Sequence, residues 1–405
     1  MAAVCAETYV YDPFAPGFSE NPYPHYRELR SVAPAYEHPL GFWIVSRYAE
    51  VAELQRSAHS VDEKYLTRLP AWKSDSADIG KRNRMMGGLS LLDQDPPDHT
   101  RLRKLVAKTF TPRAVGALRP RMEELVTGAL DRIEAAGTAD VVAELAFPVP
   151  FTVISELLGI SVVEHTRLRA LVATLVLALE PLPDPELQAR VRAADAELTA
   201  MIREQVRHKR DKPAEDLLTA LIAAEDDGDV LSEDELVAQV MLLYIAGHET
   251  TVNLLANGIH ALLRHPDQAR RLRAEPELAD NAVEEVLRYD SPVHLMRRVT
   301  VAPWSAGGVE IPAGSWVIGC LGSANRDAGF WGEDADLLRV DRPDAGRNVS
   351  FGAGVHHCLG SALARLEARV SLPRFVARFP DAEVRAVRWN GRINLRGPAE
   401  LSITV

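Results

Sequence analysis

The chain has 405 residues, of which 47% are hydrophobic and 25% charged, as in an ordinary globular protein with a large core. Its net charge of -11 disfavours generic nucleic-acid binding, because phosphate backbones attract basic surfaces. No run of about 18 uninterrupted apolar residues occurs, so the sequence predicts no membrane-spanning helix.

Hydrophobic periodicity predicts helices through the middle of the chain and strands mostly at its two ends. The clearest predicted helices are 123–136, 151–160, 231–267 and 276–291, and the clearest predicted strands are 41–47, 297–302, 307–321 and 399–405. No segment is typical of a linker. The sequence therefore predicts a mainly α fold with a smaller β portion, in a single domain spanning residues 1–405. Its predicted parts are β-rich segments near 36–60 and 296–325, the C-terminal strands, and a helical core at about 95–292 and 358–380.

The longest predicted helix lies within residues 231–267 and is marked at both ends. Ser232 and Glu235 form a capping box at its start, and Pro266 follows its end. The next helix stops before Pro292, since the residue preceding a proline disfavours helical backbone.

The chain has three cysteines, Cys5, Cys320 and Cys358, which are too few for a disulfide framework. The N-terminal segment lacks the basic and apolar regions of a signal peptide. We therefore expect a cytoplasmic protein in a reducing compartment.

Cys358 stands in the segment SFGAGVHHCLGSALA, residues 350–364, among glycines and before a predicted helix. Unpaired N–H groups at the start of that helix would stabilise a thiolate. The glycines would allow close backbone approach to something flat or bulky. From the residues alone the thiol has four interpretations, which are a buried cysteine, half of a disulfide, a nucleophile and a soft metal ligand.

The segment LLYIAGHETTVNLL, residues 242–255, carries polar residues inside the long predicted helix. Gly247 costs roughly 1 kcal/mol relative to Ala in a helix. It is either a tolerated imperfection or a kink that opens a groove for a small ligand. In the second case Glu249 and Thr250 would form an acid–alcohol pair suited to general acid work.

Three further groups of charged residues have helical spacing. Glu285 and Arg288 lie three apart, and His99 and Arg103 lie four apart on one side of a helix. Taken alone, each is an ordinary surface group. A positive cluster, unusual on an acidic protein, consists of Arg101, Lys104, Lys108 and Arg113.

The pattern Phe351-Gly352-x-Gly354-x-His356-x-Cys358-x-Gly360 resembles the haem-binding signature of the cytochromes P450. The resemblance implies that Cys358 is the thiolate ligand of haem iron, a ligand that favours O–O cleavage. It also implies that Phe351 and Gly352 lie beside the ligand and that His356 reaches a haem propionate.

Other motifs agree with this resemblance. AGHETT, residues 246–251, is similar to the oxygen-activation motif of the family, which implies that Thr250 and Glu249 serve proton delivery while Ala246 and Gly247 lie against the cofactor. Residues 95–115 resemble the family's C helix. The further roles implied are propionate partners, His99, Arg103 and Arg298; fold-holding residues, Glu285, Arg288 and Arg342; and a ferredoxin-docking surface, Arg101, Lys104, Lys108 and Arg113.

The resemblance runs from about residue 20 to the C-terminus, with the motifs in family order. It implies the cytochrome P450 fold, with haem b between the oxygen-activation helix and the helix that follows the cysteine. No flavin or nicotinamide reductase region is present, so we expect a bacterial, soluble, monomeric member. Its electrons would come from ferredoxin and ferredoxin reductase, and it would bind neither nucleic acid nor membrane.

The implied activity is a monooxygenase that inserts one atom of O₂ into a C–H or C=C bond. A peroxide-driven or isomerising enzyme of the same fold, and a non-catalytic haem sensor, are the alternatives. Position in the family predicts the substrate contacts, which are Met86, Leu89, Leu91, Leu175, Leu243, His294, Leu295, Met296 and Leu395. Because apolar types dominate, we expect a bulky, mostly apolar substrate such as a macrolide, polyketide, terpenoid or cyclic peptide.

Overall fold

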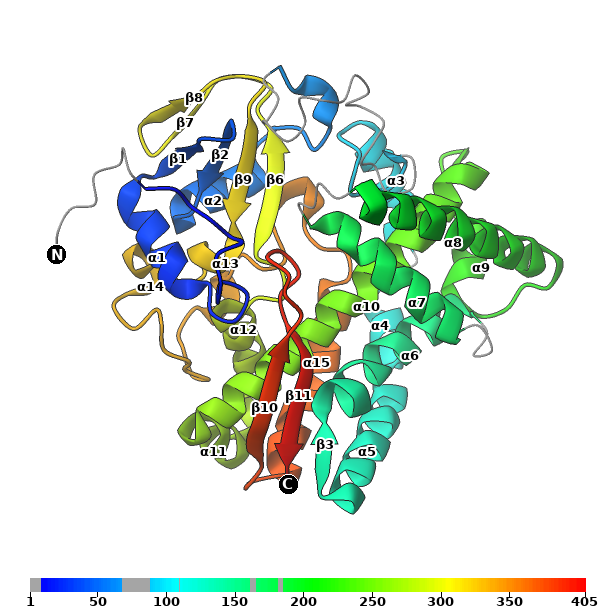
Figure 1. Ribbon diagram of the computed structural model, residues 1–405. Helices are drawn as coiled ribbons and strands as arrows, with labels where there is room; N and C mark the ends of the chain where they lie inside the picture. The colour runs from blue at the N-terminus through cyan, green and yellow to red at the C-terminus, as the bar shows by residue number, and fades with distance from the viewer. Residues whose placement is uncertain (1–8, 68–87, 109, 161–164, 181–184) are drawn as a thin grey trace.

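The computed structural model describes residues 9–67, 88–108, 110–160, 165–180 and 185–405. Helices fill most of the molecule and strands gather at its upper left and lower edge (Figure 1), so the predicted mainly α fold is confirmed. The helices are α1 Tyr23–Val32, α2 Tyr48–Arg56, α3 Asp98–Ala107, α4 Pro112–Ala117, α5 Arg119–Ala136, α6 Pro148–Leu158, α7 His165–Leu175, α8 Pro185–Asp211, α9 Leu217–Ile222, α10 Glu233–Arg264, α11 Pro266–Ala274, α12 Ala279–Tyr289, α13 Leu321–Ala324, α14 Ala328–Trp331 and α15 Ser361–Arg378. The strands are β1 Ala35–His38, β2 Phe42–Val45, β3 Thr138–Asp140, β4 Glu225–Asp226, β5 Asp229–Val230, β6 Leu295–Val299, β7 Trp304–Ala306, β8 Val309–Ile311, β9 Trp316–Cys320, β10 Glu383–Trp389 and β11 Pro398–Thr404.

Helix α10 crosses the centre of the molecule (Figure 1), and its ends follow the sequence signals. The Ser232 hydroxyl accepts from the Glu235 amide and the Glu235 carboxylate accepts from the Ser232 amide, which completes the capping box. Three acidic residues in the first turn stabilise the helix, because their negative charges lie at the positive end of the helix dipole. Because α10 is buried along most of its length, it can present side chains to the interior.

Two large apolar clusters pack against α10, one on its C-terminal half and the other on its N-terminal half. One joins α10 to α5, α12 and α15, and Leu255, Val286 and Phe375 are among its fully buried side chains. The other joins α10 to α6, α7 and α8, with Ile154 and Tyr244 among its buried side chains. Burial of this kind contributes about 1.5–3 kcal/mol for each large apolar side chain, so α10 is fixed by its packing.

The main sheet has the strand order β1-β2-β9-β6. Strands β2 and β9 are parallel, while β1–β2 and β6–β9 pairs are antiparallel. The predicted β-rich segment near 36–60 is only partly correct, because residues 48–56 form helix α2. Val51, Leu54 and Gln55 are buried on α2, which packs against β9 and α13, and their spacing of three and four residues is that of a helix face.

A second sheet has the order β10-β11-β3 and lies beside α5 at the lower edge of Figure 1. The loop between β10 and β11 extends from this sheet toward the middle of the molecule, near β6 and α10 (Figure 1). The small pairs β4–β5 and β7–β8 are antiparallel hairpins.

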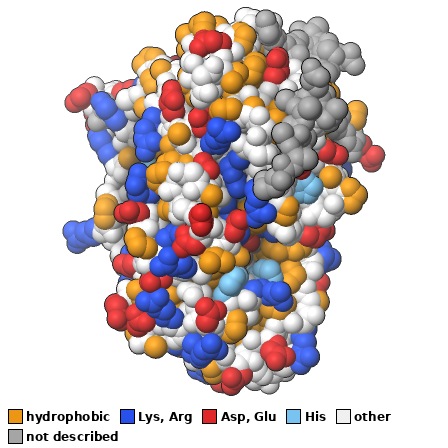
Figure 2. Space-filling view, turned by 90° about the vertical axis from the view of Figure 1, so that its left-hand side faces the viewer, with side chains coloured by type: hydrophobic (Ala, Val, Ile, Leu, Met, Phe, Trp, Pro, Cys, Tyr) orange, Lys and Arg blue, Asp and Glu red, His pale blue; other side chains and the backbone are white. Residues whose placement is uncertain are grey.

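Acidic and basic side chains are interspersed on the face of the molecule shown in Figure 2, without a broad region of one sign. The net negative charge is thus not concentrated on that face. Among the residues that the structure describes, no helix combines the length and apolar character needed to cross a bilayer.

Candidate functional site

The Cys loop, residues 349–360, depends on glycine at two positions. Gly352 and Gly354 have φ values of 69° and 68°, a left-handed conformation that favours glycine. A Cβ on Gly354 would also lie 3.0 Å from the carbonyl oxygen of Gln55 on α2. The Gln55 amide donates to the carbonyl of Val349 at 2.9 Å, so α2 holds the loop at its start.

Cys358 lies near the end of this loop, three residues before α15 begins at Ser361. Its amide donates to the carbonyl of Phe351 at 2.9 Å. Cys358 is exposed to solvent, although many protein atoms surround its sulfur. That crowding raises the pKa of the thiol, while the backbone N–H groups of Gly360 and Ser361 and the cation of Arg103 act in the opposite direction. The stabilisation predicted from the helix start is therefore present but outweighed, and a metal cation at the sulfur would shift the balance to the thiolate.

The Phe351 ring packs against Arg365, which is itself held in an ion pair with Glu284. The guanidinium of Arg365 lies 4.4 Å from the centre of the Phe351 ring, a cation–π distance. Glu284 pairs with Arg365 and also accepts from the side chain of Asn348 at 2.9 Å. The ring thus has a defined position on the Cys loop.

Four groups predicted to bind propionates come together from α3, β6 and the Cys loop. The rings of His99 and His356 have centres 4.4 Å apart, and Arg103 donates to the carbonyl of His357 at 2.7 Å. Burial, reinforced by Arg298 and His99, lowers the pKa of His356 to about 3. Burial also lowers the pKa of Arg298 to about 10. The cluster is therefore positive in character and poorly solvated.

These residues fit haem. Both ring nitrogens of His99 are buried without a hydrogen-bond partner among the described residues, which costs free energy unless an acceptor is bound. The nearby carboxylate of Asp95 accepts from Ser60 and from the amide of Val61. Two porphyrin propionates would supply acceptors for the cluster, and the sulfur of Cys358 is a suitable soft ligand for iron.

One face of α10 is accessible near its middle. Leu243, Ala246 and Thr250 follow each other at three- and four-residue spacing, so they share this face. Ala246 is exposed and the other two are partly exposed, although the helix around them is mostly buried. A small residue and a hydroxyl are thus available where a ligand could bind.

The polar residues of this stretch do not interrupt the helix. The helix is continuous from Glu233 to Arg264, and the Thr250 hydroxyl donates to the carbonyl of Ala246 at 2.8 Å. Gly247 has a packing reason, because a Cβ there would lie 3.3 Å from Cδ1 of Ile154 on α6. The structure therefore explains Gly247 by the close approach of α6.

Glu249 has a partner that the sequence did not indicate. Its carboxylate forms an ion pair with Arg392, from the turn between β10 and β11. The neighbouring His248 is 4.0 Å from it, between Nε2 and Oε2. The His248 ring is enclosed by Phe147 and Phe151, and burial lowers its pKa to about 4.

Glu285 and Arg288 form a fully buried pair, with Nε to Oε2 at 2.7 Å. The other N–H groups of Arg288 reach the carbonyls of Asn325, Ala335 and Leu337. Arg342 donates to Glu285 at 3.1 Å. The predicted contact of Arg342 with the Glu-x-x-Arg pair is present, and the three side chains join α12 to the segment that leads into the Cys loop.

The predicted substrate contacts divide into two groups. Leu91, Leu175 and Leu395 are buried in the cluster around α6, α7 and α8, and Leu243 packs against it. Leu175 is fully buried, so it contacts only protein in this conformation. Leu89 is exposed, and Met86 lies outside the described residues.

His294, Leu295 and Met296 lie elsewhere. The His294 ring is fully buried and its Nδ1 is 2.8 Å from the hydroxyl of Tyr26. Leu295 packs with the aromatic cluster around α1, and Met296 packs near α2. His294 is therefore a core residue here, which corrects its prediction as a substrate contact.

The predicted docking cluster is partly neutralised. Arg101 pairs with Glu235 and with Asp229, the latter at 3.4 Å. The ammonium group of Lys108 donates to the carbonyl of Glu225 at 2.6 Å. Lys104, Lys108 and Arg113 are exposed.

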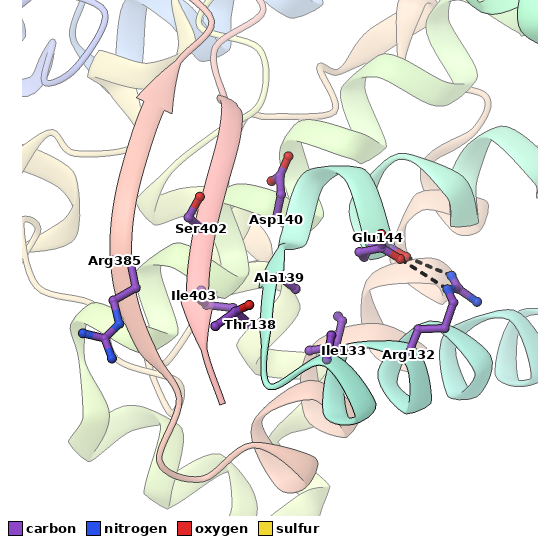
Figure 3. A pocket seen from close by; sticks show the side chains of 10 residues that line it. Arg132, Ile133, Thr138, Ala139, Asp140, Glu144, Arg385, Ser402 and Ile403 are labelled. Atoms are coloured by element: carbon purple, nitrogen blue, oxygen red, sulfur yellow. Dashed lines mark hydrogen bonds and ion pairs between the residues drawn. The ribbon is translucent and has the colours of Figure 1, made fainter.

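A surface cavity of about 570 Å³ lies apart from these residues, between α5, β3, β10 and β11 (Figure 3). Arg132 and Glu144 form an ion pair on one side of it, and Arg385 lies on the other. No described residue of the candidate site lines this cavity.

Sequence reasoning missed several residues that organise the site. Gln239 on α10 accepts from the amide of Leu91 at 3.0 Å and donates to the carbonyl of Leu89 at 2.8 Å. Arg392 holds Glu249, and Glu180 holds the turn that carries Arg392. None of these residues belongs to a local motif, and only the folded chain brings them to their partners.

The fold and the site together fit a haem-thiolate protein, because an accessible cysteine and a cationic cluster suited to propionates come together at the Cys loop. A family model described as cytochrome P450 matches residues 24–384. The chain belongs to the cytochrome P450 family.

Relatives and solved structures agree with this assignment. The chain is 40% identical to the vitamin D(3) 25-hydroxylase of Pseudonocardia autotrophica, over 94% of this chain and 92% of that protein. It is 40% identical to cytochrome P450 monooxygenase PikC of Streptomyces venezuelae, over 90% of this chain and 85% of that protein. The crystal structure of P450BioI in complex with a hexadec-9Z-enoic acid ligated acyl carrier protein has a TM-score of 0.88 and 32% identity, covering 96% of this chain and 100% of that chain. The protein is a cytochrome P450 monooxygenase, an oxidoreductase whose cofactor is haem.

Proposed function

We propose that the protein hydroxylates or epoxidises a bulky, mostly apolar small molecule, a secondary metabolite such as a macrolide, polyketide, terpenoid or cyclic peptide. The observation that supports this most directly is the accessible face of α10. It offers Leu243 and Ala246 as apolar contacts and the hydroxyl of Thr250 as a polar group. The relatives support the same substrate class, since one is named a hydroxylase of vitamin D(3).

Haem, when bound, supplies the reductive activation of O₂ and the insertion of one oxygen atom. The thiolate of Cys358 would bind its iron, with Phe351 and Gly352 beside the sulfur. His99, Arg103, Arg298 and His356 would bind its propionates, either by donating hydrogen bonds or by supplying a positive charge. Ala246 and Gly247 would form the opposing wall on α10.

Thr250 and Glu249 would deliver protons to the site. The Thr250 hydroxyl has its hydrogen engaged with the Ala246 carbonyl, so its oxygen is available as an acceptor. The Glu249 carboxylate lies one residue away and is held by Arg392. General acid work of this kind depends on placement first and on pKa second.

Substrate contacts are proposed at Leu89, Leu91, Leu243, Leu295, Met296 and Leu395, with Leu175 as a further member when the helices around it move. The predicted contact Met86 lies outside the described residues and stays a prediction. Apolar side chains at these positions would bury the substrate without fixing its polar groups. Gln239 would position the segment that carries Leu89 and Leu91.

Electrons are proposed to come from ferredoxin and ferredoxin reductase. Lys104, Lys108 and Arg113 are exposed cations of the predicted docking cluster, and an acidic partner would approach them faster than a neutral one. Arg101 would contribute less, because it is only partly exposed and pairs with Glu235 and Asp229. We further propose a monomer in the cytoplasm.

The cysteine assignment is tested by the Soret band of the reduced CO complex. The wild-type protein should show the red-shifted band of thiolate ligation, and Cys358→Ser should not. A red-shifted band in Cys358→Ser would contradict the assignment.

The activity is tested with NADPH, ferredoxin and ferredoxin reductase. Testosterone, myristic acid and a macrolactone serve as bulky apolar probes, screened by their Soret shifts and followed by mass spectrometry of products. We expect an oxygenated product whose yield falls in Thr250→Ala while NADPH consumption continues. Product formed only with added peroxide would favour the peroxide-driven alternative, and ligand binding without product would favour a sensor.

A further inference from the structure

The turn at residues 390–397, between β10 and β11, reaches the middle of the molecule (Figure 1). It is rigid in itself, because the Asn390 side chain donates to the carbonyl of Leu395 at 2.8 Å and accepts from the amide of Arg392 at 3.1 Å. It also contacts three separate parts of the fold, which are α10, the start of β6, and the segment that follows α7. Because the turn has fixed contacts on several sides, a shift of one contacting segment would shift the residues on its other sides.

Glu180, directly after the short helix Val176–Leu179, holds the turn from one side. Its carboxylate accepts from the amides of Ile393, Asn394 and Leu395 at 3.0, 3.1 and 2.9 Å. Glu180 is buried, and hydrogen bonds to a buried charged acceptor are among the strong ones. The segment after α7 and the turn are therefore joined.

Asn394 joins the same turn to β6. Its backbone carbonyl accepts from the amide of His294 at 2.9 Å, and its side-chain oxygen accepts from the amide of Leu295 at 3.0 Å. Its side-chain nitrogen donates to the carbonyl of Leu179 at 3.2 Å. The turn thus has a fixed reference on the sheet as well as on the segment after α7.

Arg392 extends from this turn to the acid on α10. The ion pair between Arg392 and Glu249 is mostly shielded from water, with side-chain exposures of 16% and 15%. The planar guanidinium fixes a carboxylate in orientation as well as in place. Apart from the distant His248 contact, Arg392 is the charged partner that the structure gives Glu249 among the described residues.

We propose that Glu180 and Arg392 are positioning residues for Glu249, and that the turn between them couples the segment after α7 to proton delivery. The proposal rests on the proposed role of Glu249. A proton donor works only within hydrogen-bonding reach of its target, and small displacements of catalytic groups are costly. Movement of the segment after α7 would then displace the acid through the turn.

The consequence can be read from the stoichiometry. In coupled turnover, substrate R–H, O₂, NADPH and H⁺ give R–OH, H₂O and NADP⁺. When protons are misdirected, O₂, NADPH and H⁺ give H₂O₂ and NADP⁺. Both reactions use two electrons from NADPH through ferredoxin, so the peroxide released per NADPH consumed measures the placement of the acid.

The experiment compares Glu180→Gln and Arg392→Gln in the haem-loaded protein, using whichever of testosterone, myristic acid or the macrolactone gives product. We expect roughly a threefold or larger rise in peroxide per NADPH in both variants. Arg392→Lys, which keeps the charge, should recover part of the coupling. The matched control is Arg388→Gln on β10, whose side chain is exposed and pairs only at 3.6 Å with Glu400; it should behave as wild type.

A second measurement separates positioning from general damage. Amide hydrogen exchange at Ile393, Asn394 and Leu395 should accelerate in Glu180→Gln. On a Glu249→Gln background, neither Glu180→Gln nor Arg392→Gln should raise the peroxide yield further, because both act through the same carboxylate.

Several results would overturn the proposal. Unchanged peroxide in Arg392→Gln would do so, as would additive increases on the Glu249→Gln background. If Glu249→Gln alone leaves coupling unchanged, the proposed role of Glu249 is wrong, which is a separate failure. The Soret band of the reduced CO complex shows that each variant is folded and loaded.

Discussion

Replacing Glu285 with Gln tests the buried charge network that supports the Cys loop. Both Glu285 and Arg288 are fully buried, and burial acts to lower the pKa of the Arg288 guanidinium while Glu285 acts to raise it. Glu285→Gln keeps the size of the side chain but removes its charge and turns one acceptor into a donor. That donor would face Nε of Arg288, which now donates to Oε2 at 2.7 Å.

The size of the effect follows from the contacts. Removing one partner of a buried pair costs about 3–5 kcal/mol, because the remaining cation is uncompensated. Arg342, which donates to the same carboxylate at 3.1 Å, would lose that counter-charge and keep only its pair with Asp334 at 2.9 Å. Against a total stability of about 5–15 kcal/mol, this is a large fraction. With a urea m-value near 3 kcal/mol/M, the midpoint should fall by about 1 M or more.

The assay is urea unfolding of the haem-loaded protein, followed by far-UV circular dichroism and by the Soret band. Glu124→Gln is the matched control, since Glu124 also pairs with an arginine three residues away but is exposed. Its midpoint should stay close to that of wild type, because exposed pairs contribute little. Equal midpoints for Glu285→Gln and Glu124→Gln would refute the argument from burial.

Three further predictions concern pH, cofactor affinity and local order. The pKa of His248 is near 6.5 in the unfolded chain and about 4 in the folded chain, so between these pH values the unfolded state binds more protons and stability falls as pH falls. His248→Leu should therefore remove about 2 kcal/mol of the stability difference between pH 7.5 and pH 5. Urea unfolding at both pH values measures this difference. Arg298→Gln should weaken haem binding about 10- to 100-fold in transfer to apomyoglobin, while Arg297→Gln, at an exposed side chain, should not. Gln239→Leu should speed amide exchange at residues 89–94, because the amide and carbonyl that it now satisfies would lose their partner.

Each of these predictions can fail clearly. The pH prediction is wrong if His248→Leu keeps the full acid sensitivity of wild type. Equal rates of haem transfer for the Arg298 and Arg297 variants would remove Arg298 from the propionate cluster. Unchanged exchange at residues 89–94 would show that Gln239 does not hold that segment.

Much of the helical framework was predictable because its signals are local. The capping box at Ser232 and the proline at position 266 set the limits of α10 from neighbouring residues alone. Residues 48–56 were predicted less well, since their short helical face is recognisable only once β9 and α13 bury it.

The Cys loop was predictable for a related reason. The left-handed turns at Gly352 and Gly354 need glycine, so the backbone requirement is written into the sequence. The cationic cluster was predicted residue by residue from a family motif. Its close ring contact between His99 and His356, and the unsatisfied nitrogens of His99, required the fold.

The sequence alone determined the class of this protein, the Cys loop with its glycines, and the long helix α10. Tertiary structure decided which side chains serve the acid and which are merely core. Glu249 meets Arg392 across 143 positions of the chain, and Glu180 meets Leu395 across 215. His294, by contrast, turned out to be bonded to Tyr26 in the interior. Local motifs specify backbone shape and spacing, whereas ion pairs between distant segments depend on the packing of the whole core, which no short pattern encodes.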